Sequence, residues 1–394
     1  MTPFFAEPLV RVGLCEDAPF GLHPQGRYSV NASEEMLTYQ PLESDASMLV
    51  KGLKIGRDFH WQQEKEMRFP GVIQVQKNKG ISTLLNILKA EQYLESVVGS
   101  EMNPDAPAEF IKAHAIIARS WLLRQLTRPG VHRDASRQSE GPSEASEVRY
   151  MRWTEADAHK GFDVCPDDHC QRYQGLDAVT DASRAAVQAT RGQVLVDADS
   201  EIADTRYSKA CGGRTELFST AWGDRDLPYL RSVECPYCAP TRLQAALKKH
   251  SHLLKGYDAS TYDYYEWTRT VSGKLIRKNL FDLLGVDVGQ ITGIEPVKRG
   301  PSGRIYELKV TGTDGELIVG KELTIRRLLS DSHLYSSAFE VEKTREGFEL
   351  HGHGWGHGVG LCQIGAAVMA AEGATAEQIL EHYYPGTRLD KAYE

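Results

Sequence analysis

The segment from His351 to Ala366 constrains the fold more than any other part of this sequence. It reads HGHGWGHGVGLCQIGA and holds three histidines and six glycines in 16 residues. Glycine at this density costs backbone entropy, so the chain must approach a neighbour closely here or turn in ways that other residues cannot. The residues from Gln363 to Ala371 predict a helix, whose free N–H groups would point back toward this loop.

The histidines of the His/Gly loop, His351, His353 and His357, have three interpretations. They could bond the hydroxyl groups of a sugar, with Gln363 as a further contact. They could hold a metal ion and make the loop the centre of a metal-dependent hydrolase. They could instead be satisfied by backbone carbonyl groups in a tight structural turn. Cys362 is predicted to be a small buried residue.

A second informative segment, Tyr93–Leu123, places Glu101 between two predicted helices. Ala90–Val98 predicts the first helix, and Pro107 suits the first turn of the next. A carboxyl group in a partly apolar pocket can act as a general acid, so Glu101 is a candidate for catalysis. The alternative is a solvated glutamate at a helix end. Glu91 and Glu95 are predicted to be solvated residues of the first helix.

The helix after Pro107 is predicted to bury one face. Apolar residues repeat there at helical spacing, namely Phe110, Ile111, Ala115, Ala118, Trp121, Leu122 and Leu126. Lys112 and Arg119 are seven positions apart, which places them on one stripe of the helix.

The seven cysteines exclude complete intramolecular disulfide pairing, because their number is odd. The run HKGFDVCPDDHC brings four zinc-type ligands into 12 residues, namely His159, Cys165, His169 and Cys170. Structural zinc takes four nitrogen or sulfur ligands, and four protein ligands would leave no position for a catalytic water. The alternatives are a Cys165–Cys170 disulfide or two free thiols.

A further set of cysteines comprises Cys211, Cys235 and Cys238. A Cys-x-x-Cys motif with a third cysteine can bind metal or change redox state. The sequence indicates no fourth ligand, and the alternative is a group of reduced, buried thiols.

The order of predicted elements favours the α+β class, since strands and helices are mixed without regular βαβ alternation. LVRVGL, FPGVIQVQKN and ISTLLNIL predict strands, GQVLVDADSEIADTRYS a strand hairpin, and residues 292–329 a β-meander. Asp181–Ala189 predicts a helix. The polar stretch up to about Lys54 predicts no regular element, and Pro129–Arg149 predicts an exposed loop.

Composition limits the function classes. The net charge of -8 and pI of about 5.9 argue against nucleic-acid binding, which needs a concentrated basic face. No apolar run reaches the roughly 18 to 20 residues of a membrane-spanning helix. The start, MTPFFAEPLVRVGL, has no basic segment followed by an apolar core, so we expect no signal peptide in it.

Several segments together resemble the SpoIID/LytB family of bacterial cell-wall proteins. They occur in the family's order: VRVGL at Val10, YLESVVGSEM at Tyr93, IKAHAIIARSWLL at Ile111, CGGRTE at Cys211, PYLRSV at Pro228, SGRIYELKVTG at Ser302 and HGHGWGHGVGLCQIGA at His351. The resemblance implies one domain over residues 9–388. Its parts are an N-terminal part with Glu101 (9–130), a zinc and CGG segment (150–240), a β-rich segment (241–350) and the His/Gly loop with the C-terminal helix (351–388).

The resemblance implies a peptidoglycan lytic transglycosylase. Such enzymes cut the β-1,4 bond between N-acetylmuramic acid and N-acetylglucosamine without water, and the 6-hydroxyl of the muramic acid forms a 1,6-anhydro end. A single carboxylic acid can serve as acid and then as base, unlike the usual glycosidase pair. Here that residue would be Glu101, with Lys112 and Arg119 orienting it or the substrate, and Tyr207 and Thr215 as further substrate contacts.

The resemblance also implies a structural zinc ion on His159, Cys165, His169 and Cys170, no organic cofactor, and a place in the cell envelope. The expected partner is the peptidoglycan glycan strand. The alternative role is a non-catalytic, glycan-binding activator of a cell-wall amidase. The chain departs from the family pattern at Cys211, which precedes GG, at Cys362, which replaces a common serine, and at residues 134–147, which look like an insertion.

Overall fold

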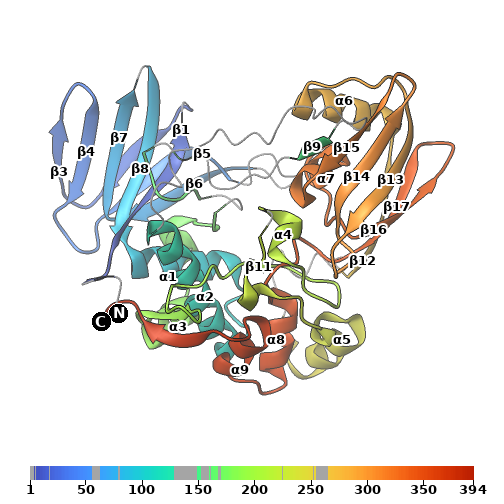
Figure 1. Ribbon diagram of the computed structural model, residues 1–394. Helices are drawn as coiled ribbons and strands as arrows, with labels where there is room; N and C mark the ends of the chain where they lie inside the picture. The colour runs from blue at the N-terminus through green and yellow to red at the C-terminus, as the bar shows by residue number, and fades with distance from the viewer. Residues whose placement is uncertain are drawn as a thin grey trace. The chain divides into compact units, whose positions relative to one another are not determined.

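A computed structural model of the chain describes residues 4, 6–16, 18–55, 63–78, 80–127, 149–151, 159, 161–166, 170–223, 225–251, 253 and 265–394. The chain divides into two compact units. Unit 1 comprises Met1–Ala135, Ala156–Asp204 and Arg388–Glu394, and unit 2 comprises Ser136–Glu155 and Thr205–Thr387. Both mix helices with mainly antiparallel sheets, which confirms the α+β class (Figure 1).

The N-terminal part of unit 1 consists of two antiparallel sheets with the strand orders β1-β8-β7-β4-β3 and β2-β5-β6. Their strands are β1 (Leu9–Glu16), β2 (Gly21–Gln25), β3 (Tyr28–Ala32), β4 (Met36–Pro41), β5 (Ser47–Ile55), β6 (Gln63–Pro70), β7 (Val72–Asn78) and β8 (Ile81–Lys89). The strands predicted at β1, β7 and β8 are confirmed. The prediction of an irregular stretch up to Lys54 was wrong, because β2, β3, β4 and nearly all of β5 lie within it. Strands β2, β3 and β4 bury no residue fully and so lack an alternating pattern, whereas β5 is largely buried and has a register shift between Val50 and Leu53.

The helical part of unit 1 consists of α1 (Ala90–Glu101), α2 (Ala108–Thr127) and α3 (Asp181–Ala189), which pack against one another, and the short 3-10 helix η1 (Gly175–Ala178). All three predicted helices are confirmed. The predicted hairpin after Gly192 is reduced to one bridge between Val196 and Ile202. Strand β10 (Gln193–Val196) instead pairs antiparallel with the C-terminal strand β19 (Arg388–Lys391).

A buried ion pair joins these helices. Arg119 of α2 is fully buried and donates to the two carboxylate oxygens of Glu91 on α1 at 2.9 and 2.7 Å. The same guanidinium reaches the carbonyl oxygen of Val187 on α3 at 3.3 Å. The prediction that Glu91 is solvated was therefore wrong, since the residue lies where three helices meet and is 7% exposed.

Unit 2 contains a β-rich part with the strand orders β13-β14-β15-β9 and β12-β17-β16. Its elements are β9 (Arg149–Met151), β12 (Glu266–Val271), α6 (Gly273–Leu284), β13 (Ile291–Arg299), β14 (Ile305–Gly312), β15 (Glu316–Gly320), α7 (Glu322–Leu328), β16 (Phe339–Lys343) and β17 (Phe348–His353). The predicted meander is confirmed for β13–β15, whereas its last part forms α7. Trp267, Ile305 and Phe348 belong to one apolar core under these elements.

The other part of unit 2 is mostly helical and includes the helix that follows the His/Gly loop. Its elements are β11 (Tyr207–Ser208), α4 (Phe218–Ala221), the 3-10 helices η2 (Pro228–Leu230) and η3 (Pro236–Cys238), α5 (Pro240–Lys249), β18 (Leu361–Cys362), α8 (Gln363–Ala371) and α9 (Ala376–Tyr383). Helix α8 has the bounds that the sequence predicts. Strands β11 and β18 pair in parallel.

Within the described residues, no helix combines the length and the apolar character that crossing a membrane requires.

Candidate functional site

Glu101 is the last residue of α1 and is half-buried. Its Oε1 accepts a hydrogen bond from the backbone N–H of Arg172 at 3.1 Å. The next residue, Tyr173, is fully buried and stacks on Tyr93 of α1 with ring centroids 5.1 Å apart. Its hydroxyl donates to Asn86 at 2.6 Å. These contacts of Tyr173 hold the segment that presents the Arg172 N–H to the carboxylate.

The same segment carries the predicted metal ligands. His159, Cys165 and Cys170 place their ligand atoms within 4.8 Å of one another, and His159 Nε2 lies 3.0 Å from Cys170 Sγ. His169, the fourth predicted ligand, lies outside the described residues. One imidazole nitrogen and two sulfurs form a donor set that suits zinc. Cys170 precedes Arg172 by two positions, so this group and the donor to Glu101 belong to one short stretch of chain.

The two basic residues predicted beside Glu101 differ in their surroundings. Lys112 is partly exposed and pairs with Glu109 one helical turn away at 2.8 Å. Arg119 is enclosed by Glu91, the Gln193 carbonyl at 3.1 Å and the Thr190 hydroxyl at 3.4 Å. Arg119 thus holds the helices of unit 1 together, and we assign it no contact with substrate.

In unit 2, the His/Gly loop surrounds a buried arginine that sequence reasoning missed. Arg304 is fully buried and donates to the carbonyl oxygens of Gly356 and Cys211, each at 3.0 Å. It also donates to the Ser302 hydroxyl at 2.9 Å, which in turn donates to buried Glu216 at 2.6 Å. The available signal was weak: Glu216 and Arg304 are two of the charged residues within the segments CGGRTE and SGRIYELKVTG, which also contain Arg214, Glu307 and Lys309.

The close approach of the loop to Arg304 explains why glycine is needed there. Gly358 has a φ of +76°, and a Cβ atom at this position would lie 2.5 Å from the guanidinium carbon. Both the backbone angle and the missing side chain are therefore required. This supports the interpretation of the loop as a tight turn whose shape is fixed by buried partners.

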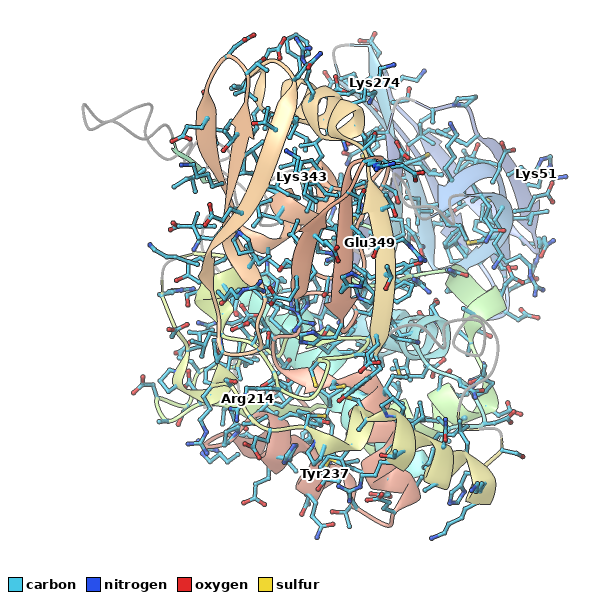
Figure 2. The ribbon with its side chains drawn as sticks, turned by 90° about the vertical axis from the view of Figure 1, so that its right-hand side faces the viewer. Lys51, Arg214, Tyr237, Lys274, Lys343 and Glu349 are labelled. Atoms are coloured by element: carbon cyan, nitrogen blue, oxygen red, sulfur yellow. The ribbon has the colours of Figure 1, made fainter. Side chains whose placement is uncertain are left out.

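The three loop histidines do not come together as one metal site. His351 is exposed on β17, with its Nε2 3.1 Å from Glu349, which is labelled in Figure 2. His353 Nε2 lies 3.3 Å from the Ser302 carbonyl oxygen. His357 accepts a hydrogen bond from the Val359 N–H at 3.0 Å. The hypothesis of a metal-dependent hydrolase built on these three residues was wrong, because each has different neighbours.

Burial and nearby arginines favour the neutral form of two of these histidines. Burial, reinforced by the positive charge of Arg304, holds the pKa of His353 below its ordinary value. Burial, reinforced by Arg206, holds the pKa of His357 well below its ordinary value. A neutral imidazole both donates and accepts hydrogen bonds, as sugar hydroxyls do.

The other predicted substrate contacts of unit 2 lie close to the His/Gly loop in the structure. Tyr207 lies on β11, directly opposite Leu361 of β18. Thr215 is fully buried, and its hydroxyl accepts a hydrogen bond from the Val233 N–H at 2.8 Å. Gln363 is the first residue of α8 and is buried. Thr215 therefore has a structural partner, while Tyr207 is half-buried.

Aromatic rings that the sequence analysis did not select flank the loop. Trp222 meets His357 edge-on at 4.8 Å, and the guanidinium of Arg206 lies 4.3 Å from the Trp222 ring centroid. Trp355, within the loop, stacks on Tyr335 at 4.3 Å. All three rings are partly exposed. Aromatic rings present apolar faces for contact, and indole adds a hydrogen-bond donor, so such a surface suits a sugar.

Comparisons with known proteins find two family models and several relatives that match this chain. A family model described as stage II sporulation protein matches residues 78–196, and one described as a domain of unknown function (DUF8618) matches residues 216–360. The chain is 26% identical to stage II sporulation protein D of Bacillus subtilis, over 77% of this chain and 74% of that protein. These matches support a SpoIID/LytB-family assignment.

Two further relatives extend the SpoIID/LytB comparison. An uncharacterized protein of Brachyspira hyodysenteriae is 26% identical over 99% of this chain and 97% of its own length. The amidase enhancer of Bacillus subtilis is 27% identical over 52% of this chain but only 32% of its own length. The SpoIID match contains Glu101 and the His159–Cys165–Cys170 group, whereas the match of unknown function contains Glu216, Arg304 and most of the His/Gly loop.

Proposed function

We propose that this protein is a peptidoglycan lytic transglycosylase of the cell envelope, with Glu101 as its single acid and base. The SpoIID and amidase enhancer relatives support a cell-wall-related role. The observation that supports Glu101 as the acid and base is the hydrogen bond from the Arg172 N–H to Glu101 Oε1 at 3.1 Å. It orients one carboxylate oxygen, and among the described residues no hydrogen bond to the other oxygen is found, which supports a role for that oxygen in proton transfer. Both Glu101 and Arg172 lie within the segment that matches SpoIID.

The proposed reaction uses one proton carrier twice. Protonated Glu101 donates its proton to the glycosidic oxygen as the bond between muramic acid C1 and that oxygen breaks. The resulting carboxylate then takes the proton of the muramic acid 6-hydroxyl, whose oxygen forms the new bond to C1. Glu101 returns to its protonated state, and no water is consumed. General acid–base catalysis of this kind contributes roughly 100- to 10,000-fold to the rate.

We propose zinc on His159, Cys165 and Cys170, with His169 as the fourth ligand. The donor set fits the ion, because zinc in structural sites binds imidazole and thiolate groups. Bound zinc would supply structural rigidity to the segment that ends in Arg172 and Tyr173. The residues themselves do the positioning: Tyr173 packs on Tyr93, and the Arg172 N–H orients Glu101.

In unit 2 we assign glycan contacts to the exposed and half-buried groups of the His/Gly loop and its rim. These are His351, His353, His357, Trp222 and Tyr207. Partly exposed rings, including that of His357, can pack on the apolar face of a sugar, and the imidazole of His353 can bond its hydroxyl groups. Lys112 is the corresponding candidate in unit 1.

The test is a digest of purified glycan strands, with and without stem peptides, followed by mass spectrometry. Wild type should give 1,6-anhydro-muramic ends, and Glu101→Gln should lower the rate at least about 100-fold while glycan binding persists. Glu95→Gln is the matched control, because Glu95 lies on the same helix and pairs with Arg184 instead. Hydrolytic products, or full activity in Glu101→Gln, would disprove the mechanism.

A second function is favoured by the match to the amidase enhancer, namely glycan binding that activates a cell-wall amidase. In that case wild type would bind glycan strands without cleaving them and would raise the rate of a purified cell-wall amidase. Glu101→Gln would then retain the full stimulation. Wild type and Glu101→Gln, compared in glycan cleavage and in amidase stimulation, therefore distinguish the two functions.

A further inference from the structure

Four buried cysteines come together in unit 2. Cys211, Cys235, Cys238 and Cys362 place their sulfurs within 4.8 Å of one another. Cys211 is 1% exposed, and the other three are 0% exposed. The prediction that Cys362 is a small buried residue is confirmed, and its sulfur also completes the set of four that the sequence left with three members.

The spacing of the sulfurs is that of ligands around one ion. The Sγ atoms of Cys211 and Cys238 are 3.6 Å apart. A disulfide needs about 2.05 Å between its sulfurs. Tetrahedral thiolates at about 2.3 Å from a zinc ion lie about 3.8 Å from each other. The observed separation therefore fits two ligands of a single tetrahedral ion and not a bonded pair.

The surroundings of the sulfurs are those of metal-bound thiolates. Cys362 Sγ accepts hydrogen bonds from the backbone N–H of Gly365 at 3.3 Å and of Cys211 at 3.4 Å. Cys235 Sγ lies 3.1 Å from the hydroxyl of buried Tyr383. Donors of this kind neutralise and orient anionic ligands around a metal. Cys362 is also the N-cap of α8, where the helix dipole favours a negative charge.

Gly365 shows that the local chain is shaped around the sulfurs. A Cβ atom at this position in the first turn of α8 would lie 2.6 Å from Cys235 Sγ and 3.3 Å from Cys362 Sγ. Only glycine allows both sulfurs to approach the helix this closely. Cys235 is the N-cap of η3 and Cys238 is its last residue; Tyr237, which lies between them, is labelled in Figure 2, and η3 packs on α8.

We propose that Cys211, Cys235, Cys238 and Cys362 bind one zinc ion as a closed, structural four-thiolate site. Four soft thiolates in tetrahedral spacing suit zinc, and no position is left for water or substrate. The site links three parts of unit 2: the segment that follows β11, the 3-10 helix η3, and the start of α8. It therefore fixes the position of Cys211, whose carbonyl accepts a hydrogen bond from Arg304, and of the end of the His/Gly loop. It belongs to unit 2 and does not depend on the proposed activity.

The experiment uses the full chain with Cys165→Ala and Cys170→Ala, which leaves the four-cysteine group untouched. Elemental analysis should find about one zinc per chain, and X-ray absorption should find about four sulfur neighbours at about 2.3 Å. No bound metal, iron in place of zinc, or a nitrogen-containing shell would overturn the proposal. So would an intact mass about 4 Da below that of the reduced chain, which would indicate two disulfides.

A second comparison guards against misfolding of that variant. Cys362→Ser in the otherwise native chain should lower the zinc content by about one ion relative to wild type and lower the temperature of unfolding. Unchanged zinc content in Cys362→Ser would contradict the site. Because both readouts are metal content, they remain informative if the transglycosylase activity itself is not found.

Discussion

Glu91 and Glu101 lie on the same helix, yet their partners give them different roles. Glu91 is enclosed by the Arg119 guanidinium, the Tyr393 hydroxyl at 2.5 Å and the Gly192 N–H at 3.3 Å. Glu101 is half-buried at the helix end and accepts a backbone hydrogen bond from Arg172. A buried carboxylate with this many donors stabilises the fold, whereas Glu101, with its one backbone donor, is the residue for which we propose proton transfer.

Arg119→Met should lower the free energy of unfolding by about 3–5 kcal/mol, because it leaves the buried carboxylate of Glu91 without its charged partner. Urea unfolding of the full chain measures this loss. The double variant Glu91→Leu/Arg119→Met removes both charges and should recover most of the stability. A single variant as stable as wild type would show that the pair does not hold the helices.

The same pair predicts how stability depends on pH. Burial alone would raise the pKa of Glu91, but the hydrogen bonds and charge of Arg119 outweigh it and hold the pKa below its ordinary value of 4.5. The pair therefore stabilises the fold above about pH 4.5, and this contribution is lost as pH falls through the lower, folded-state pKa. The free energy of unfolding, measured from pH 7 to pH 3, should fall more steeply for wild type than for the double variant. Parallel curves for the two proteins would contradict this.

Arg172→Pro should slow glycan cleavage, because proline has no N–H to donate to Glu101. Arg172→Ala is the matched control, since it keeps the backbone donor and removes only the side chain. We expect a fall in kcat of at least about tenfold in the proline variant, equal to about 1.4 kcal/mol, with KM changed less. Equal rates in the two variants, with circular dichroism spectra like that of wild type, would exclude the N–H as a positioning group.

At the scale of elements, the sequence predicted what local patterns determine. The helices α1, α2, α3 and α8 follow from apolar spacing, prolines and caps that lie within a few residues of one another. The strands β2, β3 and β4 were missed because their exposed residues do not alternate. Arg304 and Glu216 were missed as partners because the contact of Glu216 with Ser302 spans 86 positions, which no local pattern records.

The His/Gly loop offers a test of why its glycines are needed. Gly358→Ala combines a φ of +76° with a Cβ 2.5 Å from the Arg304 guanidinium, so it should destabilise the chain by more than backbone strain alone. Gly373→Ala is the control, because its φ is +101° and nothing lies within 4 Å of its Cβ. Strain alone costs about 1–3 kcal/mol. The midpoint temperature of thermal unfolding should be lower for Gly358→Ala than for Gly373→Ala. The reverse order would contradict the close approach of Gly358 to Arg304.

At the scale of the whole molecule, two groups of metal-type ligands lie in different units. The sequence indicated the His159 group because its ligands are neighbours along the chain. It indicated only three of the four cysteines in unit 2, because Cys362 lies 151 positions from Cys211. Folding through β11 and β18, which pair in parallel, brings these cysteines together. The completeness of a ligand set thus depends on topology that the spacing of a motif does not contain.

Because the two groups of metal-type ligands lie in different units, we predict that each group slows hydrogen exchange only in its own unit. Hydrogen exchange measured by mass spectrometry should show faster exchange of α1 and η1 in Cys165→Ala/Cys170→Ala, because Tyr173 and Arg172 contact α1 from the segment that Cys170 begins. Cys362→Ser should instead expose η3, α8 and the His/Gly loop, where the four sulfurs meet. Each variant serves as the control for the other. If both variants accelerated exchange in the same peptides, the two ligand groups would not act as separate anchors, and the assignment of one metal ion to each unit would fail.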